Sequence, residues 1–164
     1  MQDIADFVDQ DSLSVERGVV APNRFVCPRA IRFGHCDPAG IAFYPQYVWM
    51  LQEVVEDWWQ QALGIDFNAM IVRSGLGCPT VRLDIEFLRP SRGGDLLRFE
   101  LSVSEVGRSS MRLMLRGEGD DGLRLSAEMK LVMLDIAEHR AVPIPHKLRS
   151  RLQRFRTHGG VAST

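Results

Sequence analysis

The chain has almost no net charge and no long apolar run. Its 164 residues include 20 basic and 21 acidic side chains. Contacts with nucleic acid or with an anionic membrane surface need a broad basic surface, which this balance does not supply. No uninterrupted apolar stretch approaches the roughly 20 residues that cross a bilayer. Nucleic acids and membranes are therefore not expected as partners.

Cysteines are few, and the features of an export signal are missing. Cys27, Cys36 and Cys78 are odd in number and widely spaced, which predicts reduced thiols rather than a disulfide framework. The first eleven residues are acidic and lack the basic and apolar regions of a secretory signal. Together these features predict a cytoplasmic protein.

Ligand clusters for a metal ion and the motifs of common serine hydrolases are also missing. His35, Cys36 and Asp37 are consecutive, and consecutive residues rarely direct three ligands to one ion. No G-x-S-x-G motif occurs, and only His35 lies near a cysteine in the sequence. We therefore expect neither a metal nor a cofactor, and Cys36 is a weak candidate for a nucleophile.

Length and composition fit one globular core. Of the residues, 45% are apolar and 25% are charged, and a chain of this size buries roughly 70% of the surface that its unfolded form exposes. Residues 24–140 hold the periodic patterns of this core. Residues 1–23 show no sustained period and are interpreted as an N-terminal extension with room for a short helix. Residues 141–164 are predicted to form a basic C-terminal helix and tail.

Residues 45–64 have the periodicity of a long, largely buried helix. Pro45 suits the first turn of a helix, and Gly64 suits its C-terminal cap. Between them, apolar residues recur at steps of three and four, namely Tyr47, Leu51, Val54, Val55, Trp58, Trp59 and Ala62.

Alternating apolar residues predict five strands. The first covers residues 24–33, and its Pro28 favours an edge position because proline cannot donate to a neighbouring strand. After a connection at 65–79, four strands follow as a meander, at 81–87, 97–103, 111–115 and 123–133. The polar connections at 92–95, 106–108 and 119–122 contain the glycine or aspartate of tight hairpins.

These elements predict an α+β fold in which a curved antiparallel β-sheet wraps around one long α-helix. One helix covers five long strands only when the sheet curves around it. The outer face and the edges of the sheet then stay partly open, which favours dimerisation.

The segment Gly34-His35-Cys36-Asp37-Pro38-Ala39-Gly40 places one carboxylate just before the long helix. Proline and glycine bend the chain after Asp37, and the first N–H groups of the helix have no partner within it. A carboxylate and an oxyanion site facing each other suit acyl-thioester chemistry. The plainer interpretation of Asp37 is a turn or helix-capping residue.

Residues 33–47, Phe33-Gly34-His35-Cys36-Asp37-Pro38-Ala39-Gly40-Ile41-Ala42-Phe43-Tyr44-Pro45-Gln46-Tyr47, resemble the signature of the 4-hydroxybenzoyl-CoA thioesterase family. The segment Phe87-Leu88-Arg89-Pro90, followed by Gly94-Asp95, is similar to that family's second and third strands. The resemblance covers residues 24–140, and it implies the hotdog fold, which is a curved sheet around one helix.

The resemblance also implies an activity and a set of site residues. Asp37 takes the place of the catalytic carboxylate, a backbone N–H at the helix N-terminus near Tyr44 that of the group polarising the carbonyl, and His35 a supporting role. The substrate is an aromatic, benzoyl-type or other medium-sized acyl-CoA, and coenzyme A enters as part of it. The protein is expected to be a homo-oligomer, a dimer or a tetramer of dimers, with CoA lying partly on the neighbouring subunit.

Further residues are candidates for contacts with the substrate. Gln52 stands where the family's hydroxybenzoyl enzyme has a carboxylate, and Glu53 is beside it. Arginine pairs well with phosphate, which makes Arg89 and Arg108 candidates for CoA phosphates. The complete set is Gly40, Phe43, Tyr47, Gln52, Glu53, Gly77, Thr80, Arg89, Arg108 and Ser109.

Two mechanisms and two other functions stay open. Asp37 either attacks the thioester carbonyl to give a mixed anhydride or activates water as a general base. The alternative enzyme is a hotdog enoyl-thioester hydratase or dehydratase, for which His35 would have to supply the catalytic histidine. The alternative without catalysis is a module that binds acyl-CoA.

Overall fold

The computed structural model describes residues 17–157. The sequence left room for a short helix within residues 1–23. Residues 1–16 of that segment lie outside the residues that the structure describes. Residues 19–21 form a strand, so the sheet begins earlier than predicted. None of the helices within 17–157 is both long and apolar enough to span a membrane.

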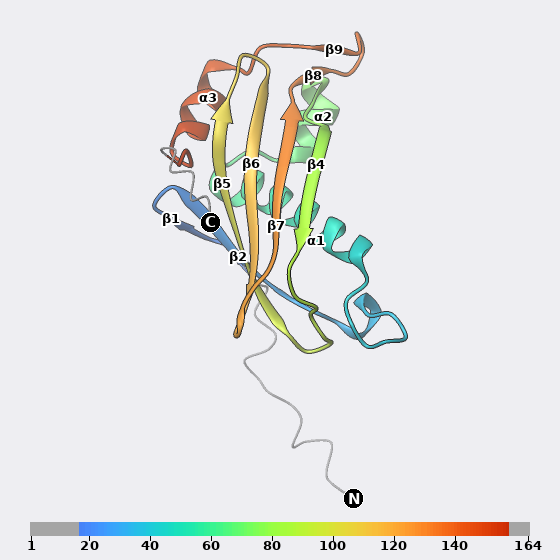
Figure 1. Cartoon of the computed structure of the whole chain (residues 1–164). Coiled ribbons are helices and arrows are strands. Elements are labelled where there is room, and N and C mark those ends of the chain that lie inside the picture. Colours follow the sequence, from blue (N-terminus) through green and yellow to red (C-terminus); the bar gives the residue numbers. More distant parts are fainter. Residues whose placement is uncertain (1–16, 158–164) are drawn as a thin grey trace, which may run out of the picture.

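Six strands form one antiparallel sheet in the order β1-β2-β5-β6-β7-β4 (Figure 1). Apolar residues alternate along β5, β6 and β7, and the buried set faces one side. The bounds are β1 Val19–Ala21, β2 Arg24–Ala30, β4 Thr80–Phe87, β5 Leu96–Val106, β6 Ser110–Gly119 and β7 Gly122–Val132.

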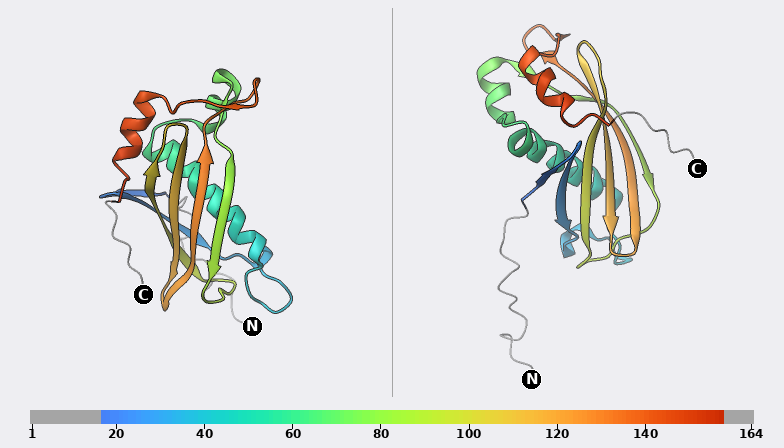
Figure 2. Two further views of the ribbon diagram at one scale, coloured as in Figure 1. Left: turned by 45° about the horizontal axis from the view of Figure 1, so that its top comes forward. Right: turned by 90° about the vertical axis from the view of Figure 1, so that its left-hand side faces the viewer.

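The long helix lies across the concave side of this sheet, as the two views of Figure 2 show. It comprises α1, Tyr44–Asp57, and a π-helical turn η4, Trp58–Ala62. Gly64, with φ of 63°, takes the left-handed conformation that ends the helix. The buried face of α1 includes Leu51, Val54 and Val55, all with no exposed surface. The predicted helix and the predicted curved sheet around it are confirmed.

The predicted four-strand meander is wrong at one connection. Strand β4 pairs with β7 and not with β5, because β2 occupies that edge of β5 from Phe25, opposite Leu101, to Ala30, opposite Leu96. Residues 88–95 therefore cross the end of the sheet instead of forming a hairpin. The hairpins at 107–109 and 120–121 are present, and β5, β6 and β7 form a three-strand meander.

One end of the molecule carries the smaller elements. Helix α2, Phe67–Ser74, falls in the segment expected to be only a connection. Its N-cap is Asp66, whose Oδ1 accepts the Ala69 N–H at 2.9 Å. Strands β3 Leu76–Gly77, β8 Leu134–Asp135 and β9 Arg140–Ala141 form a small second sheet. The basic segment near the C-terminus forms helix α3, His146–Gln153, which lies close to α2 (Figure 2).

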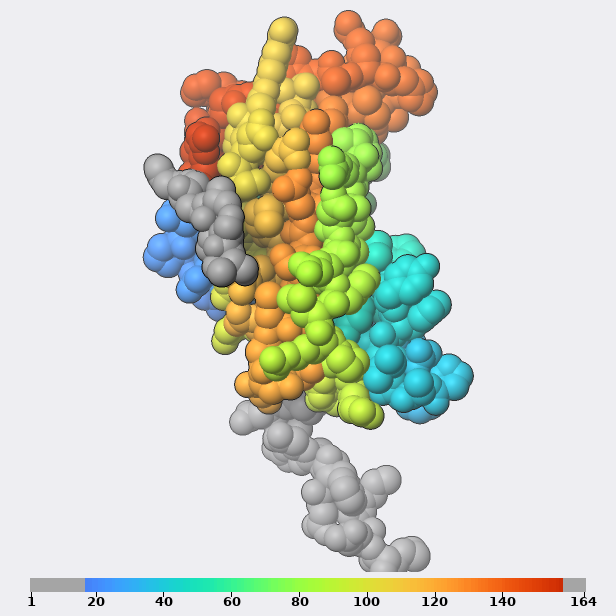
Figure 3. All heavy atoms as spheres, viewed as in Figure 1, coloured from blue at the N-terminus to red at the C-terminus, as the bar shows by residue number. Residues whose placement is uncertain are grey.

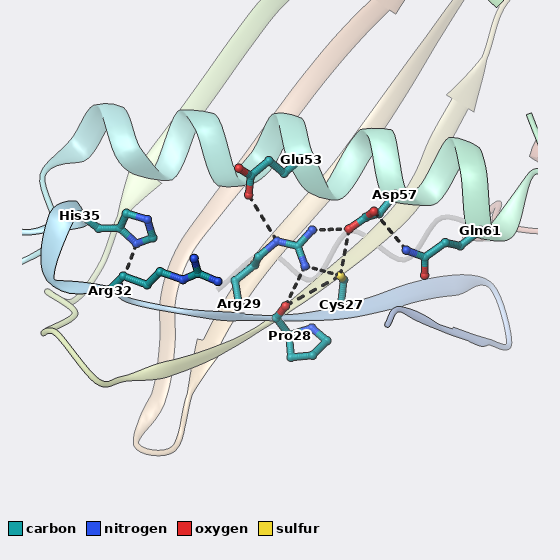
Figure 4. Close-up of polar contacts among 8 residues, drawn as sticks. All are labelled: Cys27, Pro28, Arg29, Arg32, His35, Glu53, Asp57 and Gln61. Atoms are coloured by element: carbon teal, nitrogen blue, oxygen red, sulfur yellow. Dashed lines mark hydrogen bonds and ion pairs between the residues drawn. The ribbon is translucent and has the colours of Figure 1, made fainter. Parts of the chain in front are cut away.

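A largely buried arginine joins strand β2 to helix α1 (Figure 4). Arg29 forms an ion pair with Asp57 and lies 3.5 Å from a Glu53 oxygen. It also donates to the Pro28 carbonyl at 2.9 Å and to the Cys27 sulfur at 2.8 Å. Burial lowers the pKa of the Arg29 guanidinium, but the hydrogen bond to Asp57 and nearby negative charge more than offset this, so its pKa is raised. The contact therefore joins to α1 the part of β2 that does not pair with β1.

We expect Asp57→Asn to lower the free energy of unfolding by about 1–3 kcal/mol, because it removes the charge of the carboxylate that accepts a hydrogen bond from this largely buried guanidinium. The side chains of Arg29 and Asp57 are 13% and 29% exposed. The control is Asp84→Asn, since the Arg82–Asp84 pair is about two-thirds exposed and is expected to contribute less than about 1 kcal/mol. Urea denaturation measures both. Equal losses in the two variants would show that the β2–α1 contact stabilises the fold no more than an exposed ion pair does.

Candidate active site

An open cleft of about 370 Å³ lies between the start of α1 and the end of β4. Figure 3 shows these two segments meeting on the surface, at the lower right of the view. The cleft has one carboxylate, one guanidinium and mainly apolar or aromatic walls. Its lining residues are Asp37, Ile41, Ala42, Phe43, Tyr44, Tyr47, Phe87, Leu88, Arg89 and Pro90.

Backbone hydrogen bonds hold Asp37 in a tight loop. The Asp37 N–H donates to the Ile41 carbonyl, and the Asp37 carbonyl accepts the Gly40 N–H, both at 2.9 Å. Gly40 has φ of 74°, a left-handed conformation that favours glycine. One carboxylate oxygen, Oδ1, accepts the Ala39 N–H at 2.8 Å. The other oxygen has no hydrogen-bond partner within residues 17–157, which leaves it available for chemistry in the cleft.

At the start of α1, beside the same cleft, one N–H group has no acceptor within residues 17–157. The Phe43 N–H donates to the His35 carbonyl at 2.9 Å, and the Gln46 N–H donates to the Phe43 carbonyl at 2.9 Å. Pro45 has no N–H. The Tyr44 N–H, the first of the helix, has no acceptor in the described part of the chain. The positive end of the helix dipole favours a developing negative charge there.

The structure brings five of the candidate residues to the cleft, namely Asp37, Phe43, Tyr44, Tyr47 and Arg89. The Tyr47 ring packs against Phe87, with 5.6 Å between the ring centroids. The remaining lining residues were not predicted as site residues, namely Ile41, Ala42, Phe87, Leu88 and Pro90. Leu88 and Pro90 follow β4 and border the cleft because residues 88–95 cross the end of the sheet.

His35 lies next to the cleft but does not line it. Its Nδ1 accepts the Arg32 N–H at 3.0 Å (Figure 4), and its carbonyl accepts the Phe43 N–H. These contacts tie the loop before Asp37 to the residue before α1. His35 thus holds the backbone of Arg32 and Phe43 in place, and Gly40 forms the turn beside Asp37.

The other candidates do not line this cleft in a single chain. Gln52 donates to Glu56 at 2.9 Å, and Glu53 lies near Arg29. Gly77 is in β3, Thr80 begins β4, and Arg108 and Ser109 are in the β5–β6 hairpin at the opposite end of the sheet (Figure 1). Only a second subunit could place these last residues beside Asp37.

The two buried thiols are poorly suited to nucleophilic attack. Burial raises the pKa of Cys27 to about 11, and the Arg29 charge offsets only part of that effect. Burial alone raises the pKa of Cys78 to about 12. The Cys36 sulfur lies 3.7 Å from the Arg32 carbonyl. Within residues 17–157, no group of three or more His, Cys, Asp or Glu side chains is arranged to hold a metal ion.

Comparisons with known proteins give a consistent result. The family model described as "Thioesterase-like superfamily" matches residues 31–152. A 1,4-dihydroxy-2-naphthoyl-CoA hydrolase of Thermosynechococcus vestitus is 30% identical over 122 residues, which is 73% of this chain and 82% of that protein.

Solved structures are similar over most of this chain. The gentisyl-coenzyme A thioesterase BH1999 has a TM-score of 0.71 and is 25% identical, covering 77% of this chain and 98% of its own. A 4-hydroxybenzoyl CoA thioesterase, solved with 4-hydroxybenzoyl CoA, has a TM-score of 0.73 and is 22% identical. It covers 79% of this chain and 99% of its own.

Alkaline pH is expected to destabilise the fold through Cys78. The unfolded thiol ionises near its ordinary value of 9.0, whereas the folded thiol keeps its proton to about pH 12. The free energy of unfolding therefore falls as pH rises through this window, by about 2 kcal/mol at pH 10.5 from this thiol alone. Urea denaturation at pH 8 and pH 10.5 measures the loss.

Cys78→Ala removes this contribution, so its stability is expected to fall less between the two pH values than that of the wild type. Cys36→Ala controls for the removal of a thiol elsewhere. A Cys78→Ala protein with the full wild-type pH dependence would contradict the assignment.

Proposed function

Because the chain belongs to the thioesterase-like superfamily, and is a thioester hydrolase with the hotdog fold, we propose that it hydrolyses aromatic acyl-CoA to free acid and coenzyme A. The observation that carries this proposal is the cleft at the start of α1, whose lining includes both Asp37, with one carboxylate oxygen free, and Tyr44, whose N–H has no acceptor within residues 17–157. These are the two groups that cleavage of a thioester needs.

The proposed roles follow from charge development at the carbonyl. As a nucleophile adds, negative charge grows on the carbonyl oxygen, and the Tyr44 N–H stabilises it. One such donor contributes roughly 10²–10³ in rate. Asp37 either adds to the carbonyl carbon or takes a proton from an attacking water. Because the CoA thiolate is a good leaving group, no strong general acid is required.

The walls of the cleft favour an aromatic acyl group. Phe43, Tyr47 and Phe87 supply ring surfaces against which a planar group can stack. The similar proteins support this choice, since their names specify dihydroxynaphthoyl-, gentisyl- and hydroxybenzoyl-CoA. Hydration of an enoyl thioester ranks lower, because one nitrogen of His35 already accepts a backbone N–H.

We further propose that a second subunit completes the CoA site. Strand β4 is an eight-residue edge of the sheet, and its Val81 side chain is 57% exposed. An open edge of this length is a template for pairing with another copy. Antiparallel pairing of two β4 strands would bring the β5–β6 hairpin of one subunit towards the cleft of the other. Arg108 and Ser109 of that hairpin would then join Arg89 in binding phosphates.

Asp37→Asn is expected to reduce kcat by roughly 10² or more, since the amide is neither a comparable nucleophile nor a base. Thiol release is measured with benzoyl-, hydroxybenzoyl-, dihydroxynaphthoyl- and straight-chain acyl-CoA. Cys36→Ser is the matched control and should keep wild-type turnover. Binding of these thioesters without cleavage by the wild type would favour the acyl-CoA-binding alternative, and an unimpaired Asp37→Asn would remove Asp37 from the mechanism.

Val81→Lys is expected to shift the protein from a dimer or tetramer towards the monomer, because a charge on the free edge of β4 opposes pairing. Val19→Lys tests the opposite edge of the sheet, where Val19 of the short strand β1 is 63% exposed. This variant should leave the molecular mass of the oligomer unchanged. Light scattering after gel filtration measures both. A monomeric wild type, or equal behaviour of the two variants, would overturn pairing through β4.

A further inference from the structure

A second cleft lies far from Asp37, where α2 and α3 approach each other at the other end of the molecule (Figure 2). Its volume is about 440 Å³, which is within the range of small-molecule sites in proteins. Its apolar surface comes from both helices, from Ile65 before α2, from β3 and from Met133, the residue after β7. The apolar side chains that line it are Ile65, Met70, Leu76, Met133 and Leu148.

Three cations also line this cleft, namely Arg73, Lys147 and Arg151. None of them has an ion pair within residues 17–157, although every arginine of β2, β4, β5, β6 and β7 does. Arg151 donates to the Leu63 carbonyl, which fixes its guanidinium at the rim. The carboxylate of Asp66 also lines the cleft, but it accepts the Ala69 N–H as the cap of α2.

The start of α3 adds a second feature that favours an anion. Its N-cap is Pro145, with no capping side chain, and its first turn contains no acidic residue. No side chain at the N-cap therefore accepts a hydrogen bond from the first N–H groups of α3. Lys147 places a positive charge at the positive end of the helix dipole, which is unfavourable unless an anion is close. Pro145, Lys147 and Leu148 all line the cleft. Helix α2, by contrast, is capped by Asp66.

From this combination we infer that the cleft binds an organic anion with an apolar body and one carboxylate. The carboxylate pairs with Lys147 and Arg73 near the start of α3, and the apolar body covers Met70 and Leu76. Such a ligand provides the acidic partner that the three cations lack among residues 17–157. The site is separate from the thioester cleft, and the inference does not depend on the proposed reaction.

The test is isothermal titration of the whole protein with octanoate, with octan-1-ol and acetate as matched probes. Octanoate should bind more tightly than either, since only octanoate has both the chain and the charge. The double variant Arg73→Gln/Lys147→Gln should weaken octanoate binding about tenfold or more, because it removes two charged partners. Arg154→Gln, an exposed cation at the end of α3 that does not line the cleft, should change it less than about twofold.

Three results would overturn the inference. Octan-1-ol could bind as tightly as octanoate, or the double variant could keep the wild-type affinity. The double variant could also raise KM for acyl-CoA as strongly as it weakens octanoate binding, which would assign the cations to CoA phosphates. An unchanged KM with lost octanoate binding supports a separate site, and it does so whether or not Asp37 proves to be catalytic.

Discussion

Burial of helix α1 against the concave side of the sheet is the constraint on which the rest of the structure depends. Leu51, Val54, Val55, Trp58 and Trp59 have no exposed surface, so the helix has little freedom to slide or to rotate. Because its axis is fixed by this packing, its first turn is fixed beside the end of β4. The position of the Tyr44 N–H, and thus of the candidate oxyanion site, follows from the core rather than from the loop alone.

The loop that carries Asp37 is attached to residues 88–95 at its C-terminal end. The Ala42 N–H donates to the Ser91 carbonyl at 2.8 Å, and Ile41 pairs with Arg92. Residues 88–95, which cross the end of the sheet, therefore do two things: they provide a wall of the cleft and hold the Asp37 loop against α1. In the proposed mechanism, the carboxylate and the helix N–H are thus held in place before a substrate arrives, and such preorganisation is what stabilises a transition state.

Local patterns in the sequence predicted the elements whose apolar residues recur periodically, namely α1 and the strands β2, β4, β5, β6 and β7. They did not predict which strands pair. The glycines and aspartate at 92–95 suit a hairpin, yet β2 competes for the same edge of β5, and that competition is visible only in three dimensions. Helix α2 was missed although Asp66 and Gly75 mark its ends, because only eight residues separate them.

The central claim is that a thioester carbonyl binds at the Tyr44 N–H while Asp37 faces its carbon. The most direct measurement is the isotope-edited vibrational spectrum of a benzoyl-type thioester, labelled with ¹³C at the carbonyl, bound to the Asp37→Asn protein. The account predicts that the carbonyl stretch moves to lower frequency than in water, because a helix N–H polarises the bond. A carbonyl frequency unchanged from that of the free thioester would contradict it.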